Sequence, residues 1–265
     1  MKNEKLKSSS QLTEELQSFR SKWKGGFGAT RPAMAGDPKY GQVFDACIKP
    51  YVHTETTILE IGCGRGVWTR QMEALHPKKI YCFDALSEKH NNFWEPLYSH
   101  RLNPQNIEYF HVKDFLCNEL EDNTIDYLFS YNVFVHISYS GVSAYLKNLY
   151  NKLKSGANCF VQILEMPYDF EFPVTSDRFY FLTEPSLKKT LKVSGFPRNV
   201  HGLAAYLKDY DGPAAPPGRH YLYGVKRFCE VLEKNNYEII SFDLLNSLEN
   251  SSFPAAPVIH FKKGD

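Results

Sequence analysis

Apolar residues along the chain form two alternating patterns, short continuous runs and repeats at helical spacing. The first run, residues 57–61, is β-branched and aliphatic, which is typical of a strand buried on both faces of a sheet. Glycines follow at alternate positions, and then Trp68, Met72 and Leu75 share one face of a helix. Strand, glycine-rich turn and helix in this order predict the first unit of a doubly wound α/β sheet.

The same alternation continues through most of the chain. Apolar runs predict further strands, at residues 79–83, 107–112, 124–131, 158–164, 237–245 and 258–261. Repeats at helical spacing predict helices, at residues 10–23, 40–52, 87–98, 142–153 and 225–232. A long segment between the fifth strand and the last helix interrupts this alternation.

Composition bounds the environment of the protein. A chain of 265 residues has room for one large domain, or for one domain with a sizeable insertion. The formal net charge of +1 gives no general attraction to nucleic acid or to an anionic membrane surface. No apolar run is long enough to span a bilayer, and the N-terminus lacks the apolar core of a signal peptide. We therefore expect a cytoplasmic protein with neither a nucleic-acid nor a membrane partner.

Six cysteines are scattered without a C-x-x-C pair. Three of them fall in or beside predicted core strands, so reduced, buried thiols are expected. No Cys/His pair has the spacing of zinc ligands, and no metal site is expected.

The glycine-rich turn carries the main chemical signal. Glu60 lies two residues before Gly62, Gly64 and Gly66, and the spacing G-x-G-x-G differs from the dinucleotide pattern G-x-G-x-x-G. The stretch resembles motif I of the class I S-adenosylmethionine-dependent methyltransferases, a family with a Rossmann-like fold. The alternative is a glycine-rich turn that packs a helix on a sheet without any ligand.

This resemblance implies the fold and the cofactor. The family has a doubly wound, mostly parallel seven-stranded sheet whose last strand is antiparallel, and it binds S-adenosylmethionine. Asp84, about twenty residues past the glycines, would accept the ribose hydroxyls; its alternative is a helix N-cap, which Ser87 could provide instead. Asp114 matches the acid near the adenine, and Phe115 would either stack beside the ring or pack in the core. The implied cofactor-binding residues are Glu60, Gly62, Cys63, Gly64, Gly66, Trp68, Asp84, Ala85, Asp114, Phe115 and Tyr131.

Residues 130–137, after the fourth predicted strand, should face both cofactor and acceptor, because ligands bind beyond the carboxyl ends of such strands. This block resembles that of small-molecule methyltransferases, including sugar O-methyltransferases. It lacks the proline pair of the nucleic-acid amine methyltransferases, which argues against base methylation.

Four segments follow from these assignments. Residues 1–55 form an N-terminal helical segment and cofactor lid, with Trp23 and Phe27 as lid candidates or, alternatively, as linker aromatics that cap the core. The core comprises residues 56–165 and is completed by a closing helix and strands at 221–265. Residues 166–220, rich in proline, aromatics, arginine and histidine, would be a lid-like insertion over a sugar or another polyol with an acidic group, or else a small satellite core.

A hydroxyl acceptor needs a base or a metal to take its proton. His136, just past the fourth strand, is the first candidate for the base, and Glu165, at the tip of the fifth strand, is the second. The alternative role for His136 is a hydrogen bond in the loop or at the cap of the next helix.

These inferences predict methyl transfer to a small polar acceptor, a hydroxyl of a sugar, sugar derivative or sugar nucleotide. Three alternatives stay open. The first is a small-molecule methyltransferase directed at an amine, carboxylate or phenol. The second is a non-catalytic cofactor-binding or partner-binding protein on the same fold. The third, a nicotinamide-dependent oxidoreductase, is disfavoured by the glycine spacing and by Glu60.

Overall fold

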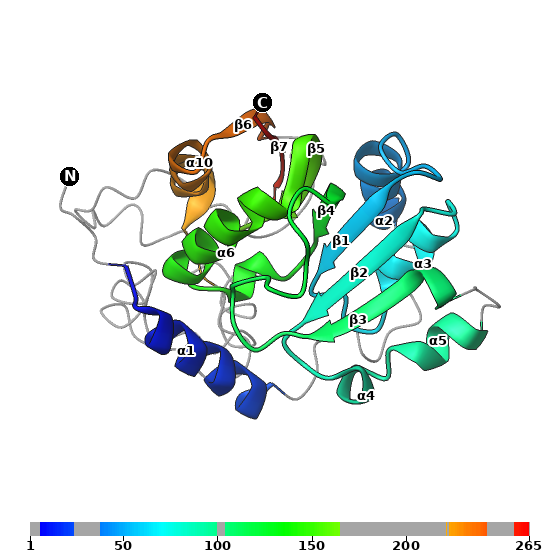
Figure 1. Cartoon of the computed structure of the whole chain (residues 1–265), viewed down its shortest axis with the longest axis horizontal. Coiled ribbons are helices and arrows are strands. Elements are labelled where there is room, and N and C mark those ends of the chain that lie inside the picture. Colours follow the sequence, from blue (N-terminus) through cyan, green and yellow to red (C-terminus); the bar gives the residue numbers. More distant parts are fainter. Residues whose placement is uncertain are drawn as a thin grey trace, which may run out of the picture.

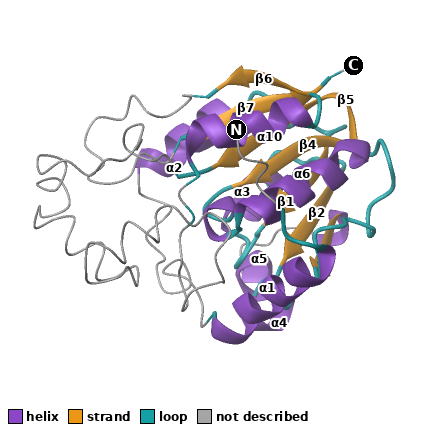
Figure 2. Ribbon diagram, turned by 90° about the vertical axis from the view of Figure 1, so that its left-hand side faces the viewer, coloured by secondary structure: helices purple, strands orange, loops and turns teal. Residues whose placement is uncertain are grey.

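The chain folds as a three-layer α/β/α arrangement, with one sheet between two layers of helices (Figure 1). The computed structural model describes residues 6–23, 38–99, 104–164, 221, 223–242 and 257–264. Figure 2 shows the helices α6 and α10 lying over the strands on one side of this sheet.

The sheet has seven strands in the order β3-β2-β1-β4-β5-β7-β6. The first five strands pair in parallel, whereas β7 pairs antiparallel with both β5 and β6. The predicted seven-stranded, doubly wound sheet with an antiparallel last strand is therefore confirmed. The strands are β1 (Thr57–Ile61), β2 (Lys79–Asp84), β3 (Ile107–His111), β4 (Ile125–Ser130), β5 (Leu153–Gln162), β6 (Tyr237–Ser241) and β7 (Val258–Lys263).

Two hydrophobic cores, one on each face of the sheet, explain which helices lie where. One core is shared by α1 (Ser9–Lys22), α6 (Tyr139–Lys152) and α10 (Gly224–Lys234). The other core includes side chains of η3, α3 and α5 and of residues beside them. The remaining helical segments are α2 (Pro38–Val43), the π-helical turn η3 (Phe44–Ile48), α3 (Val67–Glu73), α4 (Glu88–Asn91), α5 (Trp94–Ser99), and the 3-10 turns η4 (Pro104–Asn106) and η5 (Phe134–His136).

Alternation of side chains along the strands fills both cores. In β1, Ile58 packs in the core beside α3, and Leu59 packs in the core beside α6. Buried tyrosines then tie the layers together through their hydroxyl groups. Tyr127 donates to the Cys47 carbonyl at 2.6 Å, and Tyr237 donates to the Leu146 carbonyl at 2.7 Å. Each bond gives a buried phenol the partner that it needs.

The single helix predicted over residues 87–98 is wrong. Asn92 adopts the left-handed conformation, with φ of 48°, and divides the segment into α4 and α5. Asparagine tolerates this conformation better than most residues. The break lets Phe93 point into the core, where its ring meets those of Trp94 and Tyr109. Helical spacing alone does not reveal such a break.

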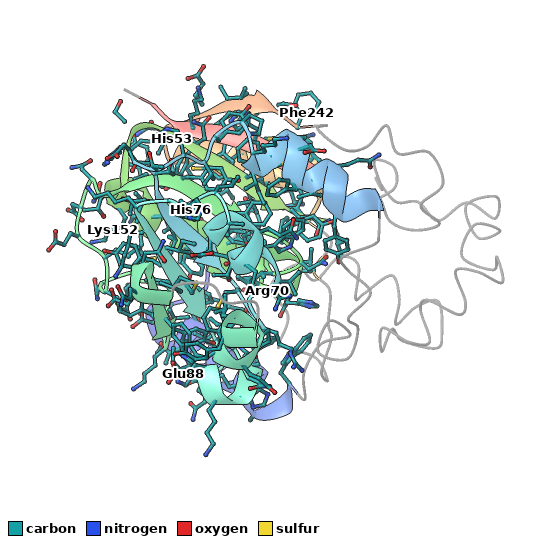
Figure 3. The ribbon with its side chains drawn as sticks, turned by 90° about the vertical axis from the view of Figure 1, so that its right-hand side faces the viewer. His53, Arg70, His76, Glu88, Lys152 and Phe242 are labelled. Carbon is teal, nitrogen blue, oxygen red and sulfur yellow. The ribbon has the colours of Figure 1, made fainter. Side chains whose placement is uncertain are left out.

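Five of the six cysteines are buried and the sixth, Cys229, is half-buried; all are free thiols, as the sequence predicts. None of the helices in the described part of the chain combines the length and the hydropathy of a membrane span. Phe242, which follows the edge strand β6, and Glu88, on α4, lie at opposite ends of the molecule (Figure 3).

Candidate functional site

The carboxyl ends of β1, β2 and β3 meet at one edge of the sheet (Figure 1). The glycine loop, residues 62–66, follows β1 at this edge, and Asp84 ends β2 there. The turn that carries His136 follows β4, the neighbour of β1 on its other side. Most sequence-predicted site residues are therefore placed on one edge.

The three glycines of the loop have different roles, although all have positive φ: 75° at Gly62, 53° at Gly64 and 72° at Gly66. A methyl group at Gly62 would lie 2.0 Å from Cγ2 of Val133, and one at Gly66 would lie 3.2 Å from the Phe93 ring. At Gly64 an added methyl would meet no heavy atom within 4 Å. Gly62 and Gly66 thus serve close packing, whereas Gly64 leaves the loop open.

Asp84 holds the glycine loop against the end of β2. Its Oδ2 accepts the Gly64 N–H at 2.9 Å, and its Oδ1 accepts the Leu86 N–H at 2.8 Å. Burial raises the pKa of Asp84, and these two backbone bonds oppose that change. The N-cap of α4 is Ser87, whose hydroxyl accepts the His90 N–H at 3.2 Å, so Asp84 is not needed as a cap.

Glu60 lies behind the loop, beneath α3, with only 2% of its surface exposed. Its Oε2 accepts a hydrogen bond of 2.5 Å from the Thr69 hydroxyl. Burial raises the pKa of Glu60 to about 8, and the bond from Thr69 opposes this. The carboxyl group therefore holds a proton near neutral pH and supports the loop from the side of α3.

Trp68 joins an aromatic cluster with Tyr40 and Tyr131. The distance between ring centroids is 5.2 Å for Trp68 and Tyr40, 5.3 Å for Trp68 and Tyr131, and 6.0 Å for Tyr40 and Tyr131. Tyr131 directly follows β4, so the cluster adjoins the site edge. Cys63, within the loop, has a buried side chain that is hydrogen-bonded to Cys82, and burial raises the pKa of its thiol.

The residues after β3 separate into a core residue and a surface residue. Phe115 packs edge-on against Tyr145 at 5.2 Å, and it is 5% exposed. Phe115 thus packs in the core, which was the second of the two roles expected for it; the first was to stack beside the adenine ring. Asp114 is half-buried, and its Oδ1 accepts the Leu116 N–H at 2.9 Å. Ala85, after β2, presents its carbonyl at 2.9 Å to Nε of Arg20.

His136 lies in the turn after β4 and contacts the N-terminal segment. Its ring centroid is 5.1 Å from that of Trp23, with an interplanar angle of 61°, and 6.5 Å from that of Phe19. The lid candidate and the first candidate base are thus brought together. Phe27, Glu165 and the insertion 166–220 lie outside the described residues.

Sequence reasoning missed several residues that build this edge. Glu15 of α1 accepts hydrogen bonds from the N–H and the hydroxyl of Ser138, at 3.1 and 2.8 Å. Gln162, at the end of β5, accepts the Asn132 N–H at 3.0 Å. A serine before a helical repeat marks Ser138 as an N-cap. Nothing local in the sequence marks Glu15 or Gln162, because their partners are far away along the chain.

No group of three or more His, Cys, Asp or Glu side chains within the described ranges is arranged to hold a metal ion.

The protonated Glu60 makes stability depend on pH. Because its folded pKa, about 8, exceeds the ordinary glutamate pKa of 4.5, the free energy of unfolding falls as pH rises through this interval. We predict that between pH 5 and pH 9 the free energy of unfolding falls by on the order of 4 kcal/mol more in the wild type than in Glu60→Gln, which does not titrate. Urea unfolding at several pH values measures this difference. Parallel pH profiles for the two proteins would contradict the prediction.

Comparison with known proteins places this edge in a known context. Residues 58–156 match the model of a family described as "Methyltransferase domain". No curated relative matches the chain.

Three solved structures share the fold. A 1,6-didemethyltoxoflavin-N1-methyltransferase from Burkholderia thailandensis, solved with S-adenosylhomocysteine, is 13% identical with a TM-score of 0.59, covering 99% of this chain and 93% of its own. A SAM-dependent methyltransferase from Methanosarcina mazei is 16% identical, with a TM-score of 0.56. The match covers 81% of this chain and 95% of that protein. An S-adenosylmethionine-dependent methyltransferase from Mesorhizobium loti is 14% identical, with a TM-score of 0.54. The match covers 86% of this chain and 99% of that protein.

The likeness to these structures establishes the fold, and the family model identifies residues 58–156 within it. The site edge fits the cofactor of such a domain, because the loop is open at Gly64 and a buried carboxylate lies beside it. Residues 58–156 therefore match a methyltransferase domain, and the fold that the described residues share with S-adenosylmethionine-dependent methyltransferases supports S-adenosylmethionine as the cofactor.

Proposed function

We propose that this protein transfers the methyl group of S-adenosylmethionine to a small polar acceptor, a hydroxyl of a sugar or sugar derivative. The observation that carries this proposal is the pairing of His136 with Trp23 at the carboxyl edge of the sheet. An imidazole can take a hydroxyl proton near neutral pH. An indole beside it offers a flat apolar wall against which a small acceptor can rest.

The cofactor would be held by the glycine loop and by Asp84. The Gly64 N–H is already bonded to Asp84, so the carboxylate fixes the loop in its open form. The carboxylate has about four acceptor positions, and its bonds from Gly64, Leu86 and Asn91 leave one that suits a ribose hydroxyl. Asp114 has an oxygen, Oδ2, that could accept from an adenine amino group, while its Oδ1 orders its own turn. Phe115 would support this turn from the core.

The different surroundings of the glycines give a matched pair of variants. Gly64→Ala should keep most of the stability, losing about 1–2 kcal/mol for a left-handed alanine, because its methyl group meets no neighbour. It should nevertheless weaken S-adenosylhomocysteine binding by at least about tenfold, or about 1.4 kcal/mol. Gly62→Ala should instead destabilise the fold by about 3 kcal/mol or more, through its clash with Val133. Chemical denaturation and calorimetric titration measure the two quantities.

If Gly64→Ala and Gly62→Ala lost the same affinity and the same free energy of unfolding, the loop glycines would act only as packing residues. Gly156→Ala provides a matched control, because Gly156 also has a positive φ, 72°, and an open surrounding, but lies in β5 away from the loop. It should lose a similar amount of stability and keep its affinity.

The chemistry at the acceptor divides between cofactor and protein. S-adenosylmethionine, when bound, supplies a methyl group on a sulfonium, whose leaving group is already activated. The chain must hold the acceptor oxygen in line, exclude water and take the hydroxyl proton. His136 would take this proton. The turn that carries it is anchored by its own backbone, through the bond from the His136 N–H to the Val133 carbonyl at 2.8 Å.

One observation favours a nitrogen acceptor as the second candidate. The cluster of Tyr40, Trp68 and Tyr131 presents aromatic rings beside the end of β4, and such rings attract ammonium groups. The neighbour from Burkholderia thailandensis is, by its name, an N1-methyltransferase of 1,6-didemethyltoxoflavin. The acceptor panel must therefore include amines and heteroaromatic rings beside sugars, sugar nucleotides, phenols and carboxylates.

A labelled methyl donor identifies the acceptor class, and a substitution then tests the base. With a hydroxyl acceptor, His136→Gln should lower kcat by about 10²–10⁴-fold, because the proton loses its acceptor. The affinity for S-adenosylhomocysteine should stay unchanged. The control is His90→Gln, an exposed histidine on α4 outside the site. Unchanged turnover in His136→Gln removes the base assignment, and methylation of amines alone replaces the hydroxyl proposal with the second candidate.

A further inference from the structure

The helix α1 lies across the carboxyl edge of the sheet rather than beside it. Figure 1 shows α1 next to the tips of β2 and β3 and to the N-terminal end of α6. Leu12 and Leu16, each 7% exposed, bury its apolar face in the core that α6 shares. Its polar contacts described below fall into two groups, one at each half of the helix.

The first half of α1 is anchored to the start of α6. The Glu15 carboxylate accepts both the N–H and the hydroxyl of Ser138, the N-cap of α6. Lys7 lies 2.6 Å from the same carboxylate, and its own N–H donates to the Ser140 hydroxyl at 2.9 Å. A negative charge at a helix N-terminus is favourable, so this contact is a docking point with a clear electrostatic cause.

The second half of α1 reaches the ends of β2 and β3 through Arg20. Its Nε donates to the Ala85 carbonyl at 2.9 Å, and its Nη2 donates to the Val112 carbonyl. The last backbone bond between these strands runs from the Val112 N–H to the Asp84 carbonyl at 2.9 Å. Beyond it, Nε2 of His111 lies 3.0 Å from the Ala85 carbonyl oxygen, and the Arg20 guanidinium bridges the same two segments through two donors.

The two bridged carbonyls belong to the segments that would enclose the adenosine. Ala85 directly follows Asp84, and Val112 lies two residues before Asp114. Asp114 also acts on Arg20, since its charge raises the pKa of the guanidinium against the lowering effect of burial. Only the rigid fork of arginine presents several N–H groups in one plane, so a lysine could not replace both bonds.

We propose that Arg20 is a positioning residue of the cofactor site, which holds the segments after β2 and β3 at the spacing that accepts the adenosine half of S-adenosylmethionine. The proposal rests on the cofactor of the domain and is independent of the acceptor and of His136. Its rival is that Arg20 merely attaches α1. The two explanations differ in whether removing the bridge weakens the binding of the adenosine half of the ligand.

Calorimetric titration of the full chain with S-adenosylhomocysteine and with 5′-methylthioadenosine, which lacks the amino-acid part, separates these accounts. Arg20→Met keeps the aliphatic stem and removes both donors. We expect it to weaken the binding of both ligands by the same factor, at least about tenfold. The affinities of Arg20→Lys should lie between those of Arg20→Met and the wild type. This variant also provides the test if Arg20→Met does not fold.

The matched control is Glu15→Gln, which loosens the other anchor of α1 without touching the two segments. The midpoint temperature of thermal unfolding should fall in both Glu15→Gln and Arg20→Met. The affinities for the two ligands should fall only in the Arg20 variants. Equal losses of affinity in Glu15→Gln would overturn the proposal in favour of simple attachment. Unchanged affinity in the Arg20 variants, or a loss for S-adenosylhomocysteine alone, would also overturn it. Failure of the wild type to bind either ligand would overturn it together with the cofactor assignment, whereas inactivity toward hydroxyl acceptors would not affect it.

Discussion

The close approach of Gly62 to Val133 is the constraint on which the site depends. A single added methyl group would lie 2.0 Å from the valine side chain, so the loop after β1 and the turn after β4 can meet only because residue 62 is glycine. The same loop is then held on its other side by Asp84, through the Gly64 N–H. The turn after Val133 carries His136, whose N–H bonds to the Val133 carbonyl. One glycine thus couples the loop after β1 to the turn that carries His136.

The helix α1 completes this edge from outside the sheet. Glu15 fixes it to the start of α6, Arg20 fixes it to the ends of β2 and β3, and Trp23 rests against His136. Glu15 and Arg20 belong to a single helix of 14 residues, and Trp23 is its C-cap. The helix α1 and Trp23, which precede the first strand, therefore adjoin the candidate site.

The sequence revealed the parts of the structure that have local causes. Buried strands such as residues 57–61 require continuous apolar runs, and a turn with positive φ at residues 62, 64 and 66 requires glycines. These features predicted the sheet, the loop and the placement of Asp84 at its edge. The break at Asn92 escaped prediction because a left-handed residue inside a helical repeat has no periodic signature.

Long-range contacts account for the rest. Phe115 packs against Tyr145, 30 positions away, and Glu15 bonds to Ser138, 123 positions away. Side-chain type alone does not encode such partners, since a phenylalanine after a strand suits either a ligand or the core. The pKa of Glu60 is a further case, because its rise depends on complete burial beneath α3 and the sequence shows only an acid within a strand.

The most direct test of this account is the crystal structure of the protein with S-adenosylhomocysteine. The account predicts that the ligand lies against the loop at Gly64, with its ribose at Asp84 and its adenine between the segments that Arg20 bridges. Density for the ligand at another face of the sheet, or adenine placed away from Ala85 and Asp114, would contradict it.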